Sequence, residues 1–228
     1  GIGMKLILFD IDGTLLISKG IGREAKRRAM LEHFGETGNI ANHVFGGKTD
    51  WFTLVELLEP YGKTSDEIGK ELAMFEERMA RHMRELMHEY EAHPIPHAME
   101  LIHCLRERND VVLGLLTGNM EKTARVKLEM AGYDLEWFEV GAYGHESPNR
   151  DDLARLAIQR AEARTGYTFS EKQVIVVGDT DADIQAARAV GAVSVVVCTG
   201  YVHRDKLITC EPDYLLADLS TFVDLIMV

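Results

Sequence analysis

Two aspartates one residue apart follow an apolar segment near the start of the chain, which runs LILFDIDGT from Leu6 to Thr14. The apolar part has the composition of a buried strand, and a strand that ends at Asp10 lets Asp10 and Asp12 border one cavity. A carboxylate taken out of water is costly unless a cation or hydrogen-bond donors replace its hydration. The pair therefore predicts a positive group beside it, with a plain acidic turn as the alternative for this segment taken alone.

Polar residues also follow two later apolar segments. Residues 111–116 (VVLGLL) are followed by Thr-Gly-Asn at 117–119, and residues 174–177 (VIVV) are followed by GDTDAD at 178–183. Either ending alone is common turn chemistry. In a parallel sheet, however, the carboxyl ends of the strands share one edge, so we expect both endings to meet Asp10.

This edge would collect oxygen ligands together with groups that bind a phosphoryl group. The carboxylates are those of Asp10, Asp12, Asp179 and Asp183. Magnesium prefers oxygen ligands and commonly takes one or two carboxylates with water and a substrate phosphate. An aspartate beside the metal stays ionised and can attack phosphorus, while Thr117, Asn119 and backbone N–H groups near Gly118 can hold phosphoryl oxygens. The sequence therefore predicts a Mg²⁺ site for phosphoryl transfer.

The elements that would carry these residues alternate along the second half of the chain. Apolar strands are expected at 111–116, 137–140, 174–177, 193–198 and 214–216, with amphipathic helices at 97–108, 120–131, 150–164 and 181–190. Strands that are apolar throughout and alternate with helices indicate a parallel sheet covered on both faces. We predict an α/β fold with a doubly wound parallel sheet, a Rossmann-like core.

A helical segment interrupts this pattern after the first strand. Helices are expected at 23–34, from Thr49 or Asp50 to 59, and from a capping box at Thr64 along an apolar stripe that reaches Tyr90. Prolines at 94 and 96 indicate a hinge after it. We therefore predict a core domain formed by residues 1–18 and 92–228 and an inserted small α-helical cap domain formed by residues 19–91.

Composition restricts the possible partners. The chain has 228 residues and a formal net charge of −12, so nucleic acid and anionic membranes would be repelled over most of its surface. The three cysteines show no close pairing, and no apolar segment is long enough to span a bilayer. We expect a cytoplasmic protein that acts on a small molecule; the sequence leaves its oligomeric state open.

The motifs DxDGT at 10–14, Thr117 and GDTxxD at 178–183 together resemble the haloacid dehalogenase-like hydrolase superfamily, and the helical insertion resembles its members with a cap after the first motif. The resemblance covers essentially the whole chain. Within the superfamily the chain most resembles the phosphoglycolate phosphatase branch. The resemblance implies a phosphatase that uses Mg²⁺ and hydrolyses a small phosphate monoester.

The resemblance also implies a role for each motif residue. Asp10 would be the nucleophile that forms an aspartyl-phosphate, and its other oxygen would bind magnesium. Asp12 would protonate the leaving alcohol and then activate the hydrolytic water, while its backbone carbonyl binds the metal. Thr117 would hydrogen-bond the phosphoryl group. Asp179 would bind the metal, and Asp183 would hold metal-bound water or bind the metal itself.

The third motif of the family departs from its usual form. It supplies a cation, often a lysine followed by proline, but the corresponding segment HESPNRDD at 145–152 contains no lysine. Arg150 is our candidate, because a guanidinium can bridge carboxylate and phosphate oxygens. A solvated arginine in the first turn of a helix is the alternative.

The cap contains the segment GGKTD at 46–50, which invites comparison with a nucleotide-binding P-loop. A P-loop needs an earlier glycine where this chain has Asn42, and no strand precedes the segment. We expect instead a loop at a helix start, where Gly47 and Lys48 meet the organic part of the substrate. A purely structural turn is the alternative.

The leading hypothesis is a Mg²⁺-dependent phosphatase of a small, phosphoglycolate-like metabolite. A phosphomutase shares Asp10 and Asp12 and differs in protecting the phosphoenzyme from water. A third possibility is a phosphate-binding or regulatory protein that has lost catalysis. Release of free phosphate separates the first hypothesis from the other two.

Overall fold

A computed structural model describes residues 3–228 and contains a six-stranded parallel sheet. Its strands, in spatial order, are β5 (Val140–Ala142), β4 (Val111–Leu116), β1 (Lys5–Phe9), β6 (Val174–Gly178), β7 (Val193–Val197) and β8 (Tyr214–Leu216). Strands β4 and β5 lie in chain order on one side of β1, and β6, β7 and β8 lie in chain order on the other side. Every neighbouring pair is parallel. The predicted doubly wound α/β sheet is confirmed, and all six strands end at the same edge.

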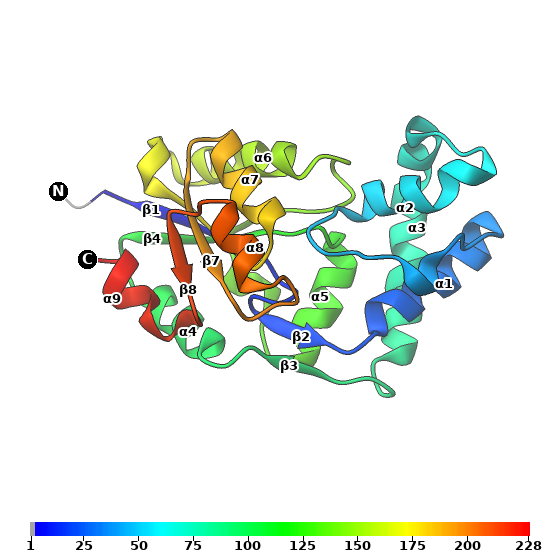
Figure 1. Cartoon of the computed structure of the whole chain (residues 1–228), viewed down its shortest axis with the longest axis horizontal. Helices are drawn as coiled ribbons and strands as arrows, with labels where there is room; N and C mark the ends of the chain where they lie inside the picture. The colour runs from blue at the N-terminus through cyan, green and yellow to red at the C-terminus, as the bar shows by residue number, and fades with distance from the viewer. Residues whose placement is uncertain (1–2) are drawn as a thin grey trace.

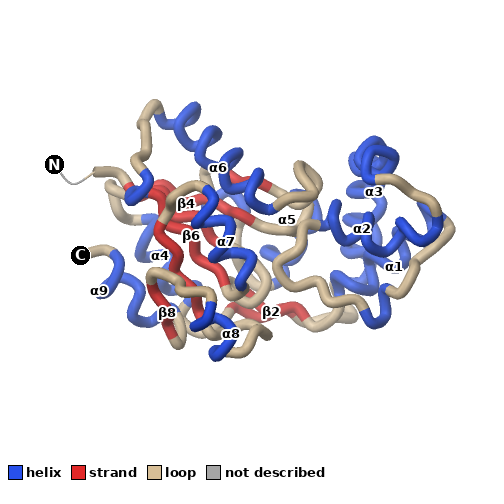
Figure 2. The backbone as a smooth tube through the Cα atoms, turned by 45° about the horizontal axis from the view of Figure 1, so that its top comes forward, coloured by secondary structure: helices blue, strands red, loops and turns tan. Residues whose placement is uncertain are grey.

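Helices cover both faces of this sheet (Figure 2). One face carries α4 (Ala98–Arg106), α5 (Glu121–Met130) and α9 (Phe222–Ile226); the other carries α6 (Arg150–Thr165) and α7 (Asp181–Ala189). Side chains alternate along β1 accordingly, with Ile7 and Phe9 packing on the first face and Leu6 and Leu8 on the second. The sheet is therefore buried on both sides. The edge at which parallel sheets of this kind bind ligands, here called the ligand edge, lies at the carboxyl ends of β1, β4 and β6.

Three further helices form a cluster beyond that edge (Figure 1). They are α1 (Ile21–Phe34), α2 (Asp50–Leu58) and α3 (Ser65–Leu86), and they lie in the chain between β2 (Leu16–Ser18) and β3 (Ala92–Pro94). The strands β2 and β3 pair antiparallel, so the chain enters and leaves this cluster at one place. The helical insertion predicted for residues 19–91 is present; its status as a separate domain stays a prediction.

Smaller elements complete the chain. These are α8 (Arg204–Thr209) and 3₁₀ turns at Ile40–Asn42, Glu59–Tyr61, Leu135–Trp137, Glu171–Gln173 and Leu219–Thr221. Among the described residues, no helix combines the length and apolarity that a membrane crossing requires.

The cap helices also pack on the core helix α5. Val126 of α5 and Met120, which directly precedes α5, are buried in the same apolar cluster as Ile21 of α1 and Phe75 and Met83 of α3. Figure 1 shows α5 between the sheet and the cap helices. The cap is thus held by apolar burial as well as by the two connecting strands.

Two predicted boundaries were wrong. The expected strand at 137–140 is a 3₁₀ turn at Leu135–Trp137, which Asp134 caps by accepting from the Glu136 N–H, and β5 begins only at Val140. The apolar side chains of this turn are buried in the core, so the sequence pattern resembled that of a buried strand. The long cap helix ends at Leu86 rather than Tyr90, because the chain turns there to reach β3.

Candidate active site

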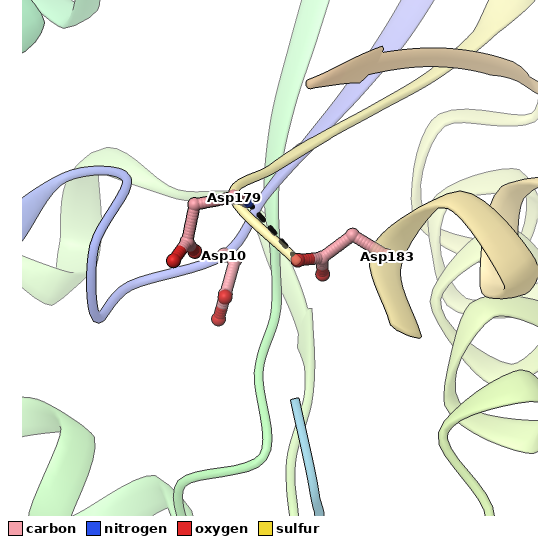
Figure 3. A group of neighbouring side chains, drawn as sticks. All are labelled: Asp10, Asp179 and Asp183. Carbon is pink, nitrogen blue, oxygen red and sulfur yellow. Dashed lines mark hydrogen bonds between the residues drawn. The ribbon is translucent and has the colours of Figure 1, made fainter. Parts of the chain in front are cut away.

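Three carboxylates meet at the ligand edge of the sheet. Asp10 follows β1, Asp179 follows β6 and Asp183 lies in the first turn of α7, and one oxygen from each lies within 4.8 Å of the other two. All three residues are buried, with 6%, 4% and 1% of their surfaces exposed. Figure 3 shows the three side chains close together, with Asp183 hydrogen-bonded to the backbone of Asp179. The sequence-based expectation that these distant residues meet is borne out.

Local structure explains this placement. The strands β1 and β6 are neighbours in register, and the backbone N–H of Asp10 donates to Val177 O at 2.9 Å, so the residues that follow both strands emerge together. Thr180 caps α7, and its N–H and hydroxyl donate to Asp183 at 3.1 and 2.8 Å. A side chain at Gly178 would place its Cβ 2.0 Å from Asp183 Cγ, so a glycine is needed there.

Arg150 links the cluster to its surroundings. Its Nη2 lies 3.0 Å from Asp10 Oδ1 and 2.9 Å from Asp183 Oδ1, and its side chain is 7% exposed. The same guanidinium donates to Gly47 O in the cap and to Leu116 O at the end of β4, each at 3.2 Å. The alternative of a solvated arginine is therefore wrong; its role in catalysis stays a prediction.

The cluster is short of positive charge. Three carboxylates face one guanidinium, and burial raises the pKa of Asp10 to about 7, with Arg150 opposing the shift and Asp183 adding to it. Burial, followed by repulsion from Asp10, also raises the pKa of Asp179 well above its usual value. A dense set of buried carboxylate oxygens with excess negative charge is the environment that a hard divalent cation stabilises.

The space around Asp179 also suits a cation. A Cβ at Gly13 would lie 2.2 Å from Asp179 Oδ2 and a Cβ at Gly200 would lie 1.8 Å from it, so two glycines keep this oxygen free of side chains. The hydroxyl of Thr14 donates to the other oxygen at 3.0 Å. The residues present therefore fit Mg²⁺, with Asp10 and Asp179 as the carboxylates least occupied by protein donors.

The carboxylate of Asp12 lies apart from this cluster. Lys127 Nζ is 3.1 Å from both of its oxygens, and Asn119 Nδ2 donates to Oδ2 at 2.8 Å. Burial works to raise the pKa of Asp12, but Lys127 and Asn119 together lower it below its ordinary value. Its side chain is 46% exposed. Asp12 is thus an ionised carboxylate beside the cluster, and metal binding through its backbone carbonyl stays a prediction.

The three residues of the Thr-Gly-Asn segment after β4 have different hydrogen-bond partners. Thr117 Oγ1 accepts from the N–H and the Nδ2 of Asn119 at 3.0 and 2.9 Å, so both of its acceptor positions are filled and its own proton is free to be donated. The Gly118 carbonyl accepts from Asp50 N in the cap at 2.8 Å. Asn119 therefore holds Asp12 and Thr117, and Gly118 holds the cap; substrate contacts by Gly118 and Asn119 stay predictions.

The predicted cap loop does reach the core. A Cβ at Gly47, whose φ is +76°, would lie 2.6 Å from the Ala182 side chain, and one at Gly118 would lie 2.0 Å from Lys48 O. The ammonium of Lys48 is 2.7 Å from Glu56 of the cap. Backbone contacts thus seat the loop beside the cluster, while the predicted contact between Lys48 and a substrate stays a prediction.

Sequence reasoning missed two buried lysines. Lys127 is 7% exposed and Lys26 of α1 is 3% exposed; Lys26 Nζ lies 2.5 Å from Asp50 Oδ1. Lys26 occupies the apolar face of its helix, three residues before Ala29 and four before Met30, which is a sequence signal for a buried ionic partner. Lys127 lies between Val126 and Leu128 and gave no comparable signal.

Known proteins are similar in sequence to this chain over most of its length. The family model described as haloacid dehalogenase-like hydrolase matches residues 4–191. Phosphoglycolate phosphatase of Vibrio cholerae serotype O1 is 26% identical, with 99% of this chain and 98% of that protein covered. Validoxylamine A 7'-phosphate phosphatase of Streptomyces hygroscopicus subsp. limoneus is 27% identical, with 95% and 94% covered.

Solved structures share the fold. A hydrolase from Pseudomonas syringae superposes with a TM-score of 0.69 at 22% identity and covers 97% of this chain and 98% of its own. A putative β-phosphoglucomutase from Bacteroides vulgatus gives 0.66 at 18% identity, with 98% and 88% covered. Since the family model spans most of the sequence, and the motif residues meet at one site, this chain belongs to the haloacid dehalogenase-like hydrolase family.

Proposed function

We propose that this protein is a Mg²⁺-dependent phosphatase that hydrolyses a small phosphate monoester through an aspartyl-phosphate on Asp10. The observation that carries the proposal is the buried cluster of Asp10, Asp179 and Asp183 with Arg150 bound across it. Phosphatases among the full-length relatives support it. A purely structural role does not account for three neighbouring buried carboxylates, since each loses hydration without full compensation.

The structure prepares one oxygen of Asp10 for attack. Oδ1 accepts from the Ile11 N–H at 2.7 Å and from Arg150, whereas no hydrogen-bond donor within residues 3–228 is assigned to Oδ2. Oδ2 is therefore the proposed nucleophile: it forms the bond to phosphorus as the bond to the leaving alcohol oxygen breaks. Arg150 stabilises charge on the carboxylate, and the hydroxyl of Thr117 donates to a phosphoryl oxygen.

Asp12 carries the protons in this scheme. It takes up a proton from solvent and gives it to the departing alcohol, and later takes one from the water that attacks the phosphorus of the aspartyl-phosphate, which returns Asp10 to its carboxylate. Its side chain is partly exposed beside the buried cluster, where a leaving group could reach it. One residue thereby serves as acid in the first step and as base in the second.

Asp10, Asp179 and the Asp12 backbone carbonyl would hold Mg²⁺, with Asp183 next to them. When bound, the ion neutralises charge on the phosphoryl group. Asp183 already accepts from Arg150 and, at its other oxygen, from Asp179 N and Thr180. We therefore propose that Asp183 holds the loop of Asp179 in position and does not itself contact the metal.

The proposed substrate is a phosphoglycolate-like monoester. The support is the similarity to several phosphoglycolate phosphatases over nearly the whole chain. The cap loop contacts the segment after β4 and the start of α7, so its residues lie beside the proposed site. Sequence identities of 25–28% leave the cap residues of these relatives free to differ.

The test is phosphate release from 2-phosphoglycolate, glycerol 3-phosphate, glucose 6-phosphate and p-nitrophenyl phosphate, each with Mg²⁺ and with EDTA. We expect turnover that needs Mg²⁺ and is abolished by Asp10→Asn, fastest with 2-phosphoglycolate. No turnover of any ester would overturn the function. Fastest turnover of another alkyl ester would overturn only the substrate.

A phosphomutase makes a different prediction for the same assay. It would convert a sugar monophosphate to its isomer and release little free phosphate, which ³¹P NMR of the reaction mixture distinguishes. A protein without catalysis would bind phosphate and show no burst of release. Both alternatives retain Asp10, so the products decide between them.

A further inference from the structure

The ammonium of Lys127 is hydrogen-bonded to three oxygen atoms, two of which belong to Asp12. It lies 3.1 Å from Asp12 Oδ1, 3.1 Å from Asp12 Oδ2 and 2.9 Å from Asn119 Oδ1. Its side chain is 9% exposed. A buried ammonium is costly unless it is fully paired. These partners satisfy it, so the lysine and the Asp12 carboxylate fix each other.

The amide of Asn119 completes the arrangement from the opposite side. Its Nδ2 donates to Asp12 Oδ2 at 2.8 Å and its Oδ1 accepts from Lys127, while its backbone N–H is bound to Thr117. The three groups therefore form a closed ring of hydrogen bonds around Asp12. Nearly half of the Asp12 side chain is exposed, so without this ring it would be free to change rotamer.

The cap determines where Lys127 can lie. A Cβ at Gly22 of α1 would be 3.2 Å from Lys127 Nζ, closer than ordinary contact. The helix that carries Lys127 is anchored to the cap by Glu76, which accepts from Lys122 N at 2.9 Å, and by buried Val126. The missing side chain at Gly22 thus leaves room for the ammonium of Lys127, and contacts between α5 and the cap fix the position of its backbone.

We propose that Lys127 is a positioning residue for the proton-transfer step: it orients the carboxylate of Asp12 toward the leaving-group oxygen. Lys127 acts through Asp12 and does not itself contact the substrate. Arg150 occupies a separate position beside Asp10 and Asp183, so Asp12 is served by a different cation from the buried cluster. This inference rests on the proposed phosphatase function.

The test compares two leaving groups on one enzyme preparation. An alkyl phosphate needs a proton on its leaving oxygen, whereas p-nitrophenolate leaves without one. For Lys127→Met we expect kcat/KM for the fastest alkyl ester of the panel to fall ~100-fold, and kcat/KM for p-nitrophenyl phosphate to fall less than ~5-fold. Because both values scale with the folded fraction, their ratio is insensitive to partial unfolding.

Three further variants sharpen the result. Lys127→Arg should restore part of the ratio of kcat/KM for the alkyl ester to kcat/KM for p-nitrophenyl phosphate, since a guanidinium can still hold a carboxylate. Asp12→Ala should change the ratio in the same direction, and adding Lys127→Met to it should cause little further loss, because residues that act as a unit are not additive. Arg125→Met removes a cation of α5 that pairs with Glu136 at 3.2 Å and should leave the ratio unchanged.

Gly22→Val offers an approach that leaves Lys127 in place. Its side chain would displace the ammonium from the cap side, and we expect a smaller shift of the ratio in the same direction. Equal losses for both esters in Lys127→Met, or full additivity with Asp12→Ala, would overturn the proposal. A wild-type enzyme that hydrolyses none of the esters would instead overturn the phosphatase function.

Discussion

Arg150 Nη1 donates to the carbonyl of Gly47 at 3.2 Å, while Nη2 of the same guanidinium lies 3.0 Å from Asp10 Oδ1. One side chain thus joins the proposed nucleophile to the loop of the cap. Each interaction uses a different nitrogen of a planar fork, which a lysine ammonium cannot reproduce from one position. These contacts link the position of Asp10 to that of the cap loop.

We expect Arg150→Met to lower kcat/KM ~100-fold or more, because the carboxylate of Asp10 and the phosphoryl group both lose a fixed positive charge. Arg150→Lys should restore less than half of the lost activation free energy, since one ammonium cannot bind Asp10, Asp183 and Gly47 together. Steady-state kinetics with saturating Mg²⁺ measure both effects. Full activity in the lysine variant would contradict the bridging role.

The stability of the metal-free protein should depend on the protonation of Asp10. Its pKa is raised to about 7 in the folded state, so the folded protein binds a proton more tightly than the unfolded chain. The associated stability is present at low pH and is lost as the pH rises toward and through 7; Asp179 contributes with the same sign. We therefore expect Asp10→Asn to raise Tm in EDTA at about pH 8 and to have little effect at about pH 5.

Thermal unfolding at several pH values measures this difference directly. Mg²⁺ should raise the Tm of the wild-type protein more at high pH than at low pH, because the ion competes with protons for the same carboxylates. A difference between wild type and Asp10→Asn that stays constant with pH would contradict the assignment.

The glycine beside Asp179 provides a test of the metal site. In Gly200→Ala the new Cβ would lie 1.8 Å from Asp179 Oδ2 in the present geometry, so the carboxylate must move. We expect the Mg²⁺ concentration for half-maximal activity to rise ~10-fold or more. Gly46→Ala is a matched control, since its Cβ would have no neighbour within 4 Å. Equal Mg²⁺ dependence in both variants would argue against Asp179 as a ligand.

The ion pair between Lys26 and Asp50 should contribute to the stability of the cap. Lys26→Met leaves Asp50 buried without its cation, and loss of one partner of a buried pair typically costs ~3–5 kcal/mol. The double variant Lys26→Met, Asp50→Asn should be more stable than the single one, because no unpaired charge remains. Urea unfolding followed by circular dichroism gives both values, and a single variant as stable as wild type would refute the prediction.

The sequence sufficed where topology alone brings residues together. Parallel strands end at one edge, so the meeting of Asp10 with Asp179 required only that both follow strands of one sheet. Arg150 was chosen because the resemblance to the family implies a cation in a segment without lysine; its contacts with Asp10 and Asp183 fit this choice, and its role stays a prediction. These inferences depend on the order of elements and tolerate errors in their exact boundaries.

Other features depend on packing that periodicity does not encode. Lys127 reaches Asp12 across 115 positions because α5 is fixed between the sheet and the cap. Nothing in the chain near Lys127 distinguishes it from an exposed helix lysine. The ion pair of Lys48 with Glu56 at 2.7 Å was not predicted either, although its contact with a substrate stays a prediction. Such pairings follow only from side-chain positions in three dimensions.

The antiparallel pairing of β2 with β3 has a consequence for how such enzymes diversify. Ser18 pairs with Ala92, so the chain leaves the core and returns to it at adjacent positions, like the two ends of a long hairpin. Insertions at such a point are tolerated well because the strands of the parent fold keep their contacts. The segment between Ser18 and Ala92 is therefore a natural unit of exchange. Its replacement could alter which alcohol is accepted while Asp10 and Asp179 keep their places at the strand ends.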